Sequence, residues 1–271
     1  MLALAPSFVT LSLLFSTAYA GKRGLAWPWY NAPLNPAVFA GSGQVVAIYD
    51  WETYQPPSTD GTGGLEFIGM QGCQDCDSSP LSALQSRASE QGWTTVFSVN
   101  EPDIPGSSAM SPSDAANWYK TNINPLNIRK ALPAVTSSTS CGEGLDWLSQ
   151  MISACAGACQ YDYINLHWYG NTFSDFQSHV ENARAMFPST NIVITEFALS
   201  NPTNGASDQT AFFQQAFQWL DSQDYVTLYF PFVATSPSLA QANSGGADVD
   251  TSSCLYDDSG ALSSVGQLVL S

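Results

Sequence analysis

Positively charged residues are scarce in this sequence of 271 residues. It holds 7 Lys and Arg against 23 Asp and Glu, which gives a formal net charge of −16 at pH 7. Proteins that bind nucleic acids or anionic membrane surfaces attract them mainly through Lys and Arg. The scarcity argues against nucleic acid and membrane partners and favours a neutral ligand.

Long hydrophobic runs are also missing, apart from an apolar stretch at the N-terminus. This stretch, residues 1–20, is too short and too often interrupted by proline and serine to span a bilayer. Ala18 and Ala20 place small residues where signal peptidase recognises its substrate. No basic residue precedes Lys22, so a buried N-terminal element is the alternative. We expect a signal peptide over residues 1–20 and a mature protein of residues 21–271, secreted to the medium or the cell wall.

Histidine is rare, with two residues, whereas the sequence contains six cysteines. An even number of cysteines in a secreted chain favours disulfides. The closely spaced pairs Cys73/Cys76 and Cys155/Cys159 would alternatively offer four zinc ligands. We expect all six cysteines to be oxidised, with the pairing left open, and neither a metal ion nor a cofactor.

Short runs rich in β-branched and aromatic residues recur along the chain, and most are followed by a helical pattern or a turn-rich connection. Strands are predicted at Arg23–Trp27, Gln44–Trp51, Glu66–Met70, Thr94–Val99, Lys130–Val135, Tyr163–Trp168, Asn191–Thr195 and Val226–Phe232. Helices are predicted at Pro80–Gln91, Ser113–Asn122, Leu145–Ala156, Phe173–Met186 and Ser207–Ser222. Eight strands alternating with helices in about 250 residues indicate an α/β fold, a (β/α)₈ TIM barrel.

The first units of this barrel are irregular. Residues 31–42 and 55–64 are rich in Pro, Gly, Ser and Asn, which predicts loops or short helices lining a cleft. Residues 235–271 predict one last short helix packed on the barrel. Because no linker divides the chain, we expect a single catalytic domain and a monomer.

Two glutamates end strands that are otherwise apolar. Glu101 follows the fourth predicted strand, and Glu196 lies at the end of the seventh. Catalytic residues of this barrel come from the C-terminal ends of the strands, and the ends of strands four and seven face each other across its mouth. A carboxylate at a buried strand end is costly unless it is paired or functional. Because basic partners are scarce, the pair favours catalysis over a helix cap and a salt bridge.

Two facing carboxylates are the chemistry of glycosidic bond hydrolysis. One protonates the leaving oxygen, and the other attacks the sugar or activates water. The sequence therefore predicts a glycoside hydrolase. The alternatives are a non-catalytic glucan-binding or cell-wall protein on the same barrel, and more remotely a metalloenzyme.

The sequence resembles a known family. Asn100-Glu101-Pro102 and Thr195-Glu196-Phe197 are similar to the strand ends of the clan of retaining (β/α)₈ glycosidases. Within the clan the chain resembles glycoside hydrolase family 128 from Gly24 to about Phe232, in three motifs. These are Gly24-Leu25-Ala26-Trp27 with Trp29-Tyr30, Gly72-Cys73-Gln74-Asp75-Cys76 and Asn165-Leu166-His167-Trp168-Tyr169.

The resemblance implies an endo-β-1,3-glucanase acting on β-glucan polysaccharide, with Glu101 as acid/base and Glu196 as nucleophile. β-1,4-Mannanase, β-1,4-glucanase and β-1,6-glucanase activities would use the same carboxylates and remain alternatives. The chain departs from the clan at the ends of strands two and eight. Many members have Arg and Trp there, whereas this sequence has Tyr49-Asp50-Trp51 and Tyr229-Phe230-Pro231-Phe232.

A retaining site implies carboxyl groups roughly 5 Å apart. At that separation we expect the anionic Glu196 to raise the pKa of Glu101.

Further substrate-binding residues are expected around the two glutamates. His167 and Tyr169 lie two apart on one strand, so both face the same side and are expected to bind a sugar hydroxyl or orient Glu196. Asn100 is expected to bind the sugar 2-hydroxyl. His179 is expected at the surface. Five aromatic residues are expected either to stack on sugar rings or to pack in the core: Trp27, Trp29, Tyr30, Trp51 and Trp168.

Overall fold

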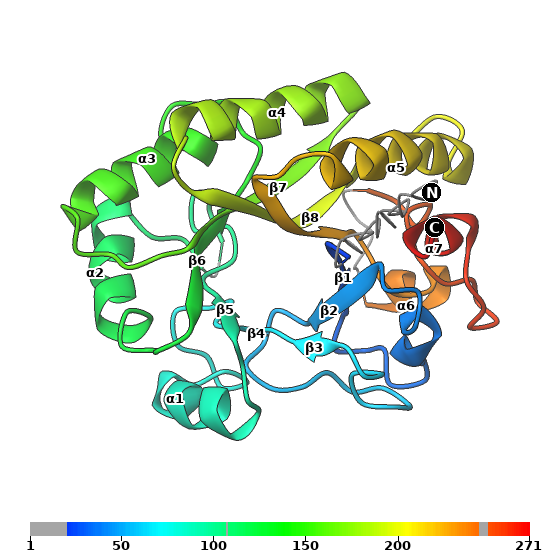
Figure 1. The fold of residues 1–271 in the computed structure, drawn as a ribbon, viewed down its shortest axis with the longest axis horizontal. Helices are drawn as coiled ribbons and strands as arrows, with labels where there is room; N and C mark the ends of the chain where they lie inside the picture. Colours follow the sequence, from blue (N-terminus) through cyan, green and yellow to red (C-terminus); the bar gives the residue numbers. More distant parts are fainter. Residues whose placement is uncertain (1–20, 107, 244–248) are drawn as a thin grey trace, which may run out of the picture.

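The computed structural model describes residues 21–106, 108–243 and 249–271, and the expected signal peptide lies outside them. The strands form one parallel sheet in the order β3-β2-β1-β9-β8-β7-β6-β5-β4 (Figure 1). The strands are β1 (Arg23–Ala26), β2 (Val45–Tyr49), β3 (Glu66–Phe67), β4 (Gly69–Met70), β5 (Thr95–Phe97), β6 (Arg129–Val135), β7 (Tyr163–Gly170), β8 (Asn191–Leu199) and β9 (Val226–Pro231). Each of the eight predicted strands is present, and the expected TIM barrel is confirmed.

The third predicted strand divides into two short strands at Ile68. β3 pairs with β2, and β4 pairs with β5, each through two residue pairs. Ile68 lies between them and donates its backbone N–H to the Ile48 carbonyl, 3.0 Å away. The two short strands therefore form a seam that closes the ring.

Aromatic side chains fill the barrel interior. Tyr49, Phe97 and Phe230 are fully buried and meet edge to face, with ring centroids 5.0 to 5.7 Å apart. Alanines on the neighbouring strands leave room for these rings, so the interior is a packed core and not a pore. A second, larger apolar cluster lies between the strands and the surrounding helices.

Five long helices cover the outside of the barrel, at the positions predicted. Ser111 begins one of them as expected, because its hydroxyl accepts the Asp114 N–H and Pro112 follows it. Another helix begins at Ala206 after Gly205, slightly before the expected Ser207. The long helices are α1 (Leu81–Glu90), α2 (Pro112–Asn122), α3 (Gly144–Cys155), α4 (Phe173–Met186) and α5 (Ala206–Asp221).

The irregular segments contain only short helices. A 3₁₀ helix, Pro36–Phe39, occupies the first connection, and no helix occupies residues 50–65. The tail carries two short helices, α6 (Pro237–Ala242) and α7 (Ser264–Val269), where one was expected. Within the described residues, no helix is long and apolar enough to cross a membrane.

The expectation of six oxidised cysteines is wrong for two of them. Cys73 is bonded to Cys76, and Cys155 to Cys159. Cys141 is exposed and Cys254 is buried, and both are free thiols. The two close pairs are therefore cystines and not zinc ligands.

Candidate active site

Glu101 and Glu196 lie together at the C-terminal end of the barrel. Glu101 follows β5, and its backbone N–H donates a hydrogen bond to the Ala134 carbonyl of β6, 2.9 Å away. Glu196 belongs to β8 and is 7% exposed. One oxygen of each carboxylate lies within 4.8 Å of the other. The barrel thus brings together two glutamates that are 95 positions apart in the sequence.

His167, on β7, connects the two glutamates. Its Nδ1 atom lies 2.8 Å from Oε1 of Glu101, and its Nε2 atom lies 3.5 Å from Oε1 of Glu196. The ring is fully buried. His167 therefore orients the carboxylates of Glu101 and Glu196, and the expected contact with a sugar hydroxyl is wrong because both ring nitrogens face protein atoms.

Thr195 and Asn165 determine that Nε2 of the His167 ring carries a proton. We did not predict either residue. The Thr195 hydroxyl donates to Oδ1 of Asn165 at 2.9 Å, so its oxygen accepts from His167 Nε2–H, also at 2.9 Å. With Nε2 protonated, Nδ1 is free to exchange a proton with Glu101. The sequence carried a signal for this arrangement, because Asn165, His167 and Tyr169 alternate along one buried strand.

Two neutral donors hold both oxygens of Glu196. The Trp51 indole N–H donates to Oε1 at 2.7 Å, and the Tyr169 hydroxyl donates to Oε2 at 2.5 Å. Such bonds favour the ionised carboxylate and fix its orientation. Tyr169 therefore contacts Glu196 directly, and its contribution to substrate binding stays a prediction.

Trp51 occupies the end of strand two, where many members of the clan have Arg. Its backbone has φ +64°, and Glu101 has φ +44°. Left-handed backbone at residues other than glycine is strained and is concentrated at functional sites. Gly72 lies against Trp51 so closely that a Cβ atom there would meet the Trp51 carbonyl oxygen at 2.4 Å. The geometry around Trp51 thus requires glycine at position 72.

The pKa values of Glu101, His167 and Glu196 are not all shifted in the same direction. Burial would raise the pKa of Glu101, but the hydrogen bond and charge of His167 outweigh it and lower that pKa. Burial raises the pKa of Glu196, and the charge of Glu101 adds to the effect. Burial would lower the pKa of His167, but the charges of both glutamates raise it. The expectation that Glu196 raises the pKa of Glu101 is wrong here, because His167 holds the proton between them.

Trp29 and Tyr30 have exposed surface that a ligand can reach, and Asn100 has an amide oxygen without a hydrogen-bond partner among the described residues. Asn100 precedes Glu101, and its buried Oδ1 atom has no hydrogen-bond partner among the described residues. Trp29 is 60% exposed and packs edge to face with the half-buried Tyr30, 5.6 Å between centroids. Burial raises the pKa of Tyr30 to about 12, so its hydroxyl is a neutral donor.

Trp27 and Trp168 belong to the core, so their expected stacking on substrate is wrong. Trp27 is fully buried, and its indole donates to the Pro57 carbonyl at 3.1 Å. Trp168 alternates with His167 and Tyr169 on β7 and so faces the helices, where it stacks on Phe212.

His179 is not the surface residue that we expected. It is half-buried on α4, and its Nε2 atom has no hydrogen-bond partner among the described residues. Burial lowers its pKa to about 4. The ring is therefore neutral at pH 7.

Glu101, His167 and Glu196 also have atoms close enough to hold a metal ion. Their surroundings fit an acid–base site better. Hydrogen-bond donors already meet both oxygens of Glu196, and His167 uses both nitrogens in the bonds described. The arrangement can hold one carboxylate ionised and supply a proton from the other.

Comparison with known proteins identifies the family. The protein-family model described as glycosyl hydrolase catalytic core matches residues 24–268 of this chain. A subgroup IV endo-β-1,3-glucanase of glycoside hydrolase family 128 from Lentinula edodes is 62% identical. That match covers 92% of this chain and 99% of that chain, with a TM-score of 0.88.

Two more distant relatives agree with this assignment. A curdlan-specific exo-β-1,3-glucanase of the same family, subgroup III, from Blastomyces gilchristii is 26% identical; the match covers 93% of this chain and 98% of that one, with a TM-score of 0.72. Alkali-sensitive linkage protein 1 of Schizosaccharomyces pombe is 32% identical over 264 residues, 94% of this chain. The chain spans 45% of that protein's length. The chain has two glutamates at opposed strand ends and matches these relatives over most of its length. It is therefore a glycoside hydrolase and belongs to family 128.

Proposed function

We propose that this protein is a retaining endo-β-1,3-glucanase in which Glu101 is the acid/base and Glu196 the nucleophile. The separation of the two carboxylates carries the proposal, because oxygens of the two groups lie within 4.8 Å. Retaining enzymes place their carboxyl groups about 5 to 5.5 Å apart, whereas inverting enzymes need about 6.5 to 9.5 Å to admit water between them and the sugar.

In the first step, Glu196 attacks the anomeric carbon and the glycosidic C–O bond breaks. Trp51 and Tyr169 hold the attacking carboxylate in place. The leaving oxygen needs a proton, which the Glu101–His167 pair supplies. The proton held on His167 Nδ1 crosses the 2.8 Å hydrogen bond to Glu101, and the Glu101 carboxylic acid then gives its proton to the leaving oxygen.

In the second step, water cleaves the glycosyl ester on Glu196. The ester has no negative charge, so Glu101 no longer faces an anion and acts as a carboxylate base. It takes a proton from water while the water oxygen bonds to the anomeric carbon, and Glu196 leaves as a carboxylate. One residue thus serves both halves of the reaction.

The substrate assignment rests on the 62% identical relative, which is an endo-β-1,3-glucanase. Polar and aromatic groups at the ends of the strands support a sugar chain as the ligand. We assign the Asn100 amide, next to Glu101 in the chain, to a sugar 2-hydroxyl, and the exposed Trp29 ring to stacking on a sugar ring. We further propose that the protein is secreted, because its two disulfides are typical of an oxidising compartment.

Azide rescue tests the two roles. Glu101→Ala is expected to be nearly inactive on laminarin but to lose much less on an aryl glycoside, whose leaving group needs no proton. Azide should restore turnover and give the β-glycosyl azide. Glu196→Ala is expected to fail on both substrates, and any azide product should be the α-anomer.

Glu90→Ala is the matched control, because Glu90 is an exposed glutamate at the end of α1. It should keep full activity. An α-azide from Glu101→Ala would reverse the assigned roles. Faster hydrolysis of mannan or carboxymethylcellulose than of laminarin by the unmodified enzyme would refute the substrate assignment.

A further inference from the structure

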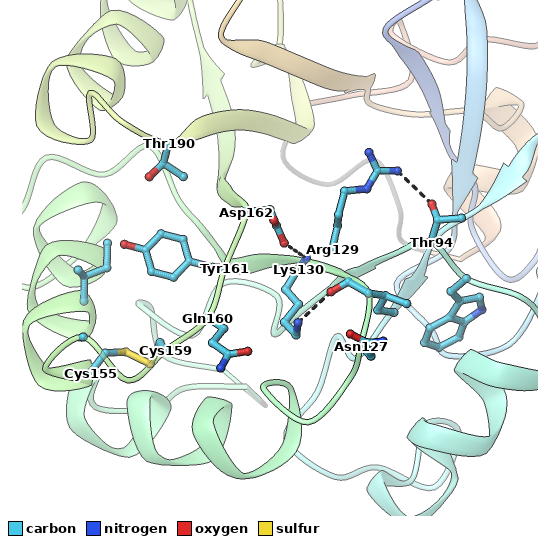
Figure 2. A pocket seen from close by; sticks show the side chains of 14 residues that line it. Thr94, Asn127, Arg129, Lys130, Cys155, Cys159, Gln160, Tyr161, Asp162 and Thr190 are labelled. Atoms are coloured by element: carbon cyan, nitrogen blue, oxygen red, sulfur yellow. Dashed lines mark hydrogen bonds between the residues drawn. A yellow bond between two sulfur atoms is a disulfide. The ribbon is translucent and has the colours of Figure 1, made fainter.

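A cavity lies at the opposite end of the barrel from Glu101 and Glu196. It has a volume of about 1030 Å³, which suits a ligand of several rings. Its lining includes residues that come just before or at the start of four strands, β5 to β8: Thr94, Arg129, Asp162 and Thr190. Figure 2 shows these side chains around the cavity with the Cys155–Cys159 disulfide. The position at the N-terminal ends of the strands separates it from the catalytic site.

Several polar side chains that line this cavity have no hydrogen-bond partner among the described residues. The amides of Asn127 and Gln160 and the hydroxyls of Tyr161 and Thr190 make no hydrogen bond with other residues that the structure describes. They offer both donors and acceptors within one concave surface. Such a mixed set suits the hydroxyl groups of a sugar.

Lys130 lies in the lining with donors to spare. It is only 7% exposed, and its ammonium makes one hydrogen bond, to the Ile128 carbonyl at 2.8 Å. No carboxylate forms an ion pair with it in the described part of the chain. A buried ammonium carries three N–H donors, so two remain for a ligand or water. In the view of Figure 2, Lys130 lies between Gln160 and Asn127.

The charges argue for a neutral ligand. Arg129 and Lys130 line the cavity together with Asp162, and Glu66 is close by through its hydrogen bond to Thr94. These charges balance locally, while the whole chain carries −16 and repels anions.

The cavity wall also has apolar surface. The partly exposed Tyr161 ring, with Ile128 and Ile152 in the same lining, gives faces for sugar C–H groups.

From this cavity we infer a second, non-catalytic site that binds a neutral β-glucan segment at the N-terminal end of the barrel. The identity of the glucan rests on the function proposed above. Because the two sites face opposite ways, one chain segment is held while the catalytic site cuts another. Binding at the second site should matter for insoluble glucan and not for short soluble oligosaccharides.

The double variant Asn127→Ala/Gln160→Ala removes two exposed amides and leaves the core intact. We expect its kcat/KM on laminaripentaose to stay within about twofold of the unmodified enzyme. Its retention on insoluble β-1,3-glucan should fall at least about fivefold, as expected for the loss of two hydrogen bonds. Lys130→Met, which keeps the buried stem but removes the donors, should weaken retention in the same way. Asn182→Ala, an exposed amide on α4 outside the cavity, is the matched control.

Retention is measured separately from cleavage, so the two proposals fail in different ways. If the unmodified enzyme does not cleave laminaripentaose, the proposed activity is wrong, whereas retention that depends on Asn127 and Gln160 still supports the second site. If it cleaves, but both variants bind insoluble glucan as tightly as the control, the second site is refuted. Equal loss of retention and of pentaose hydrolysis would also refute it.

Discussion

His167 lies between Glu101 and Glu196, with Nδ1 2.8 Å from the Glu101 carboxylate. Because Nε2 keeps its proton through Thr195, one further proton is shared across the Nδ1 bond. It resides on His167 as an ion pair or on Glu101 as a neutral acid, with no change in total charge. The acid of the proposed mechanism is therefore a pair of residues, Glu101 and His167, that titrates as a unit.

The pH profile of kcat/KM is expected to be bell-shaped. In the proposed mechanism Glu196 must be ionised to attack, so activity falls as pH drops through its raised pKa. The Glu101–His167 pair must keep its proton, so activity also falls as pH rises through the raised pKa of His167.

His167→Asn tests which group sets the alkaline limb. The amide still donates to Glu101 but does not titrate, so the limb then reports Glu101 alone and should move to lower pH. Initial rates from about pH 3 to 9, with stability checked at each pH, measure both limbs. An alkaline limb left in place would exclude His167 as the proton holder.

Trp51→Phe keeps the ring but removes the hydrogen bond to Glu196 Oε1. A hydrogen bond to a charged group is worth about 1.5 to 3 kcal/mol, so kcat/KM should fall about 10- to 150-fold. The acid limb should move to higher pH, because a donor that lowers the pKa of Glu196 is lost. The control is Phe232→Leu, because Phe232 packs against Trp51 but makes no hydrogen bond to Glu196. An acid limb that does not move in Trp51→Phe would contradict the role of Trp51 as a donor to Glu196.

Trp27 and Trp29 give a paired test, because the first is fully buried and the second is 60% exposed. Trp27→Ala is expected to destabilise the fold by about 3 to 5 kcal/mol through the cavity it leaves. Trp29→Ala should leave the free energy of unfolding nearly unchanged and raise KM for laminarin. Denaturant unfolding and kinetics separate the effects, and an unchanged KM in Trp29→Ala would remove this ring from the substrate site.

Thiol titration without reductant should find two thiols after unfolding. In the folded protein only Cys141 should react quickly, because Cys254 is 2% exposed and burial raises its pKa to about 12. Cys141→Ser should therefore abolish the fast reaction. Six thiols after unfolding would show that both disulfides are absent.

The strands were predictable because each is a short apolar run, and a run such as 191–195 admits few other structures. The division of the third strand was not, since composition does not show that pairing changes partner at Ile68. It depends on which neighbour each short strand meets when the ring closes.

The proximity of Glu101 and Glu196 was predictable because carboxylates seldom end apolar strands and these two strand ends face each other across the barrel. The aromatic residues were harder, because stacking on sugar and packing in a core require the same side chains. Alternation along β7 separates Trp168 from His167 and Tyr169. Trp27 is buried because a loop covers it, and its indole donates to the Pro57 carbonyl of that loop. The local sequence around Trp27 does not reveal this cover.

The seam at Ile68 has a consequence for local opening of the barrel. Two residue pairs join β3 to β2 and two join β4 to β5, whereas eight join β7 to β8. His167 and Glu196 therefore lie on the most firmly paired part of the ring, while Trp51 lies beyond β2 at the seam. Amide hydrogens around residues 66–72 should exchange earlier than those of β7 and β8. Each opening would release Glu196 from its Trp51 donor while His167 stays in place.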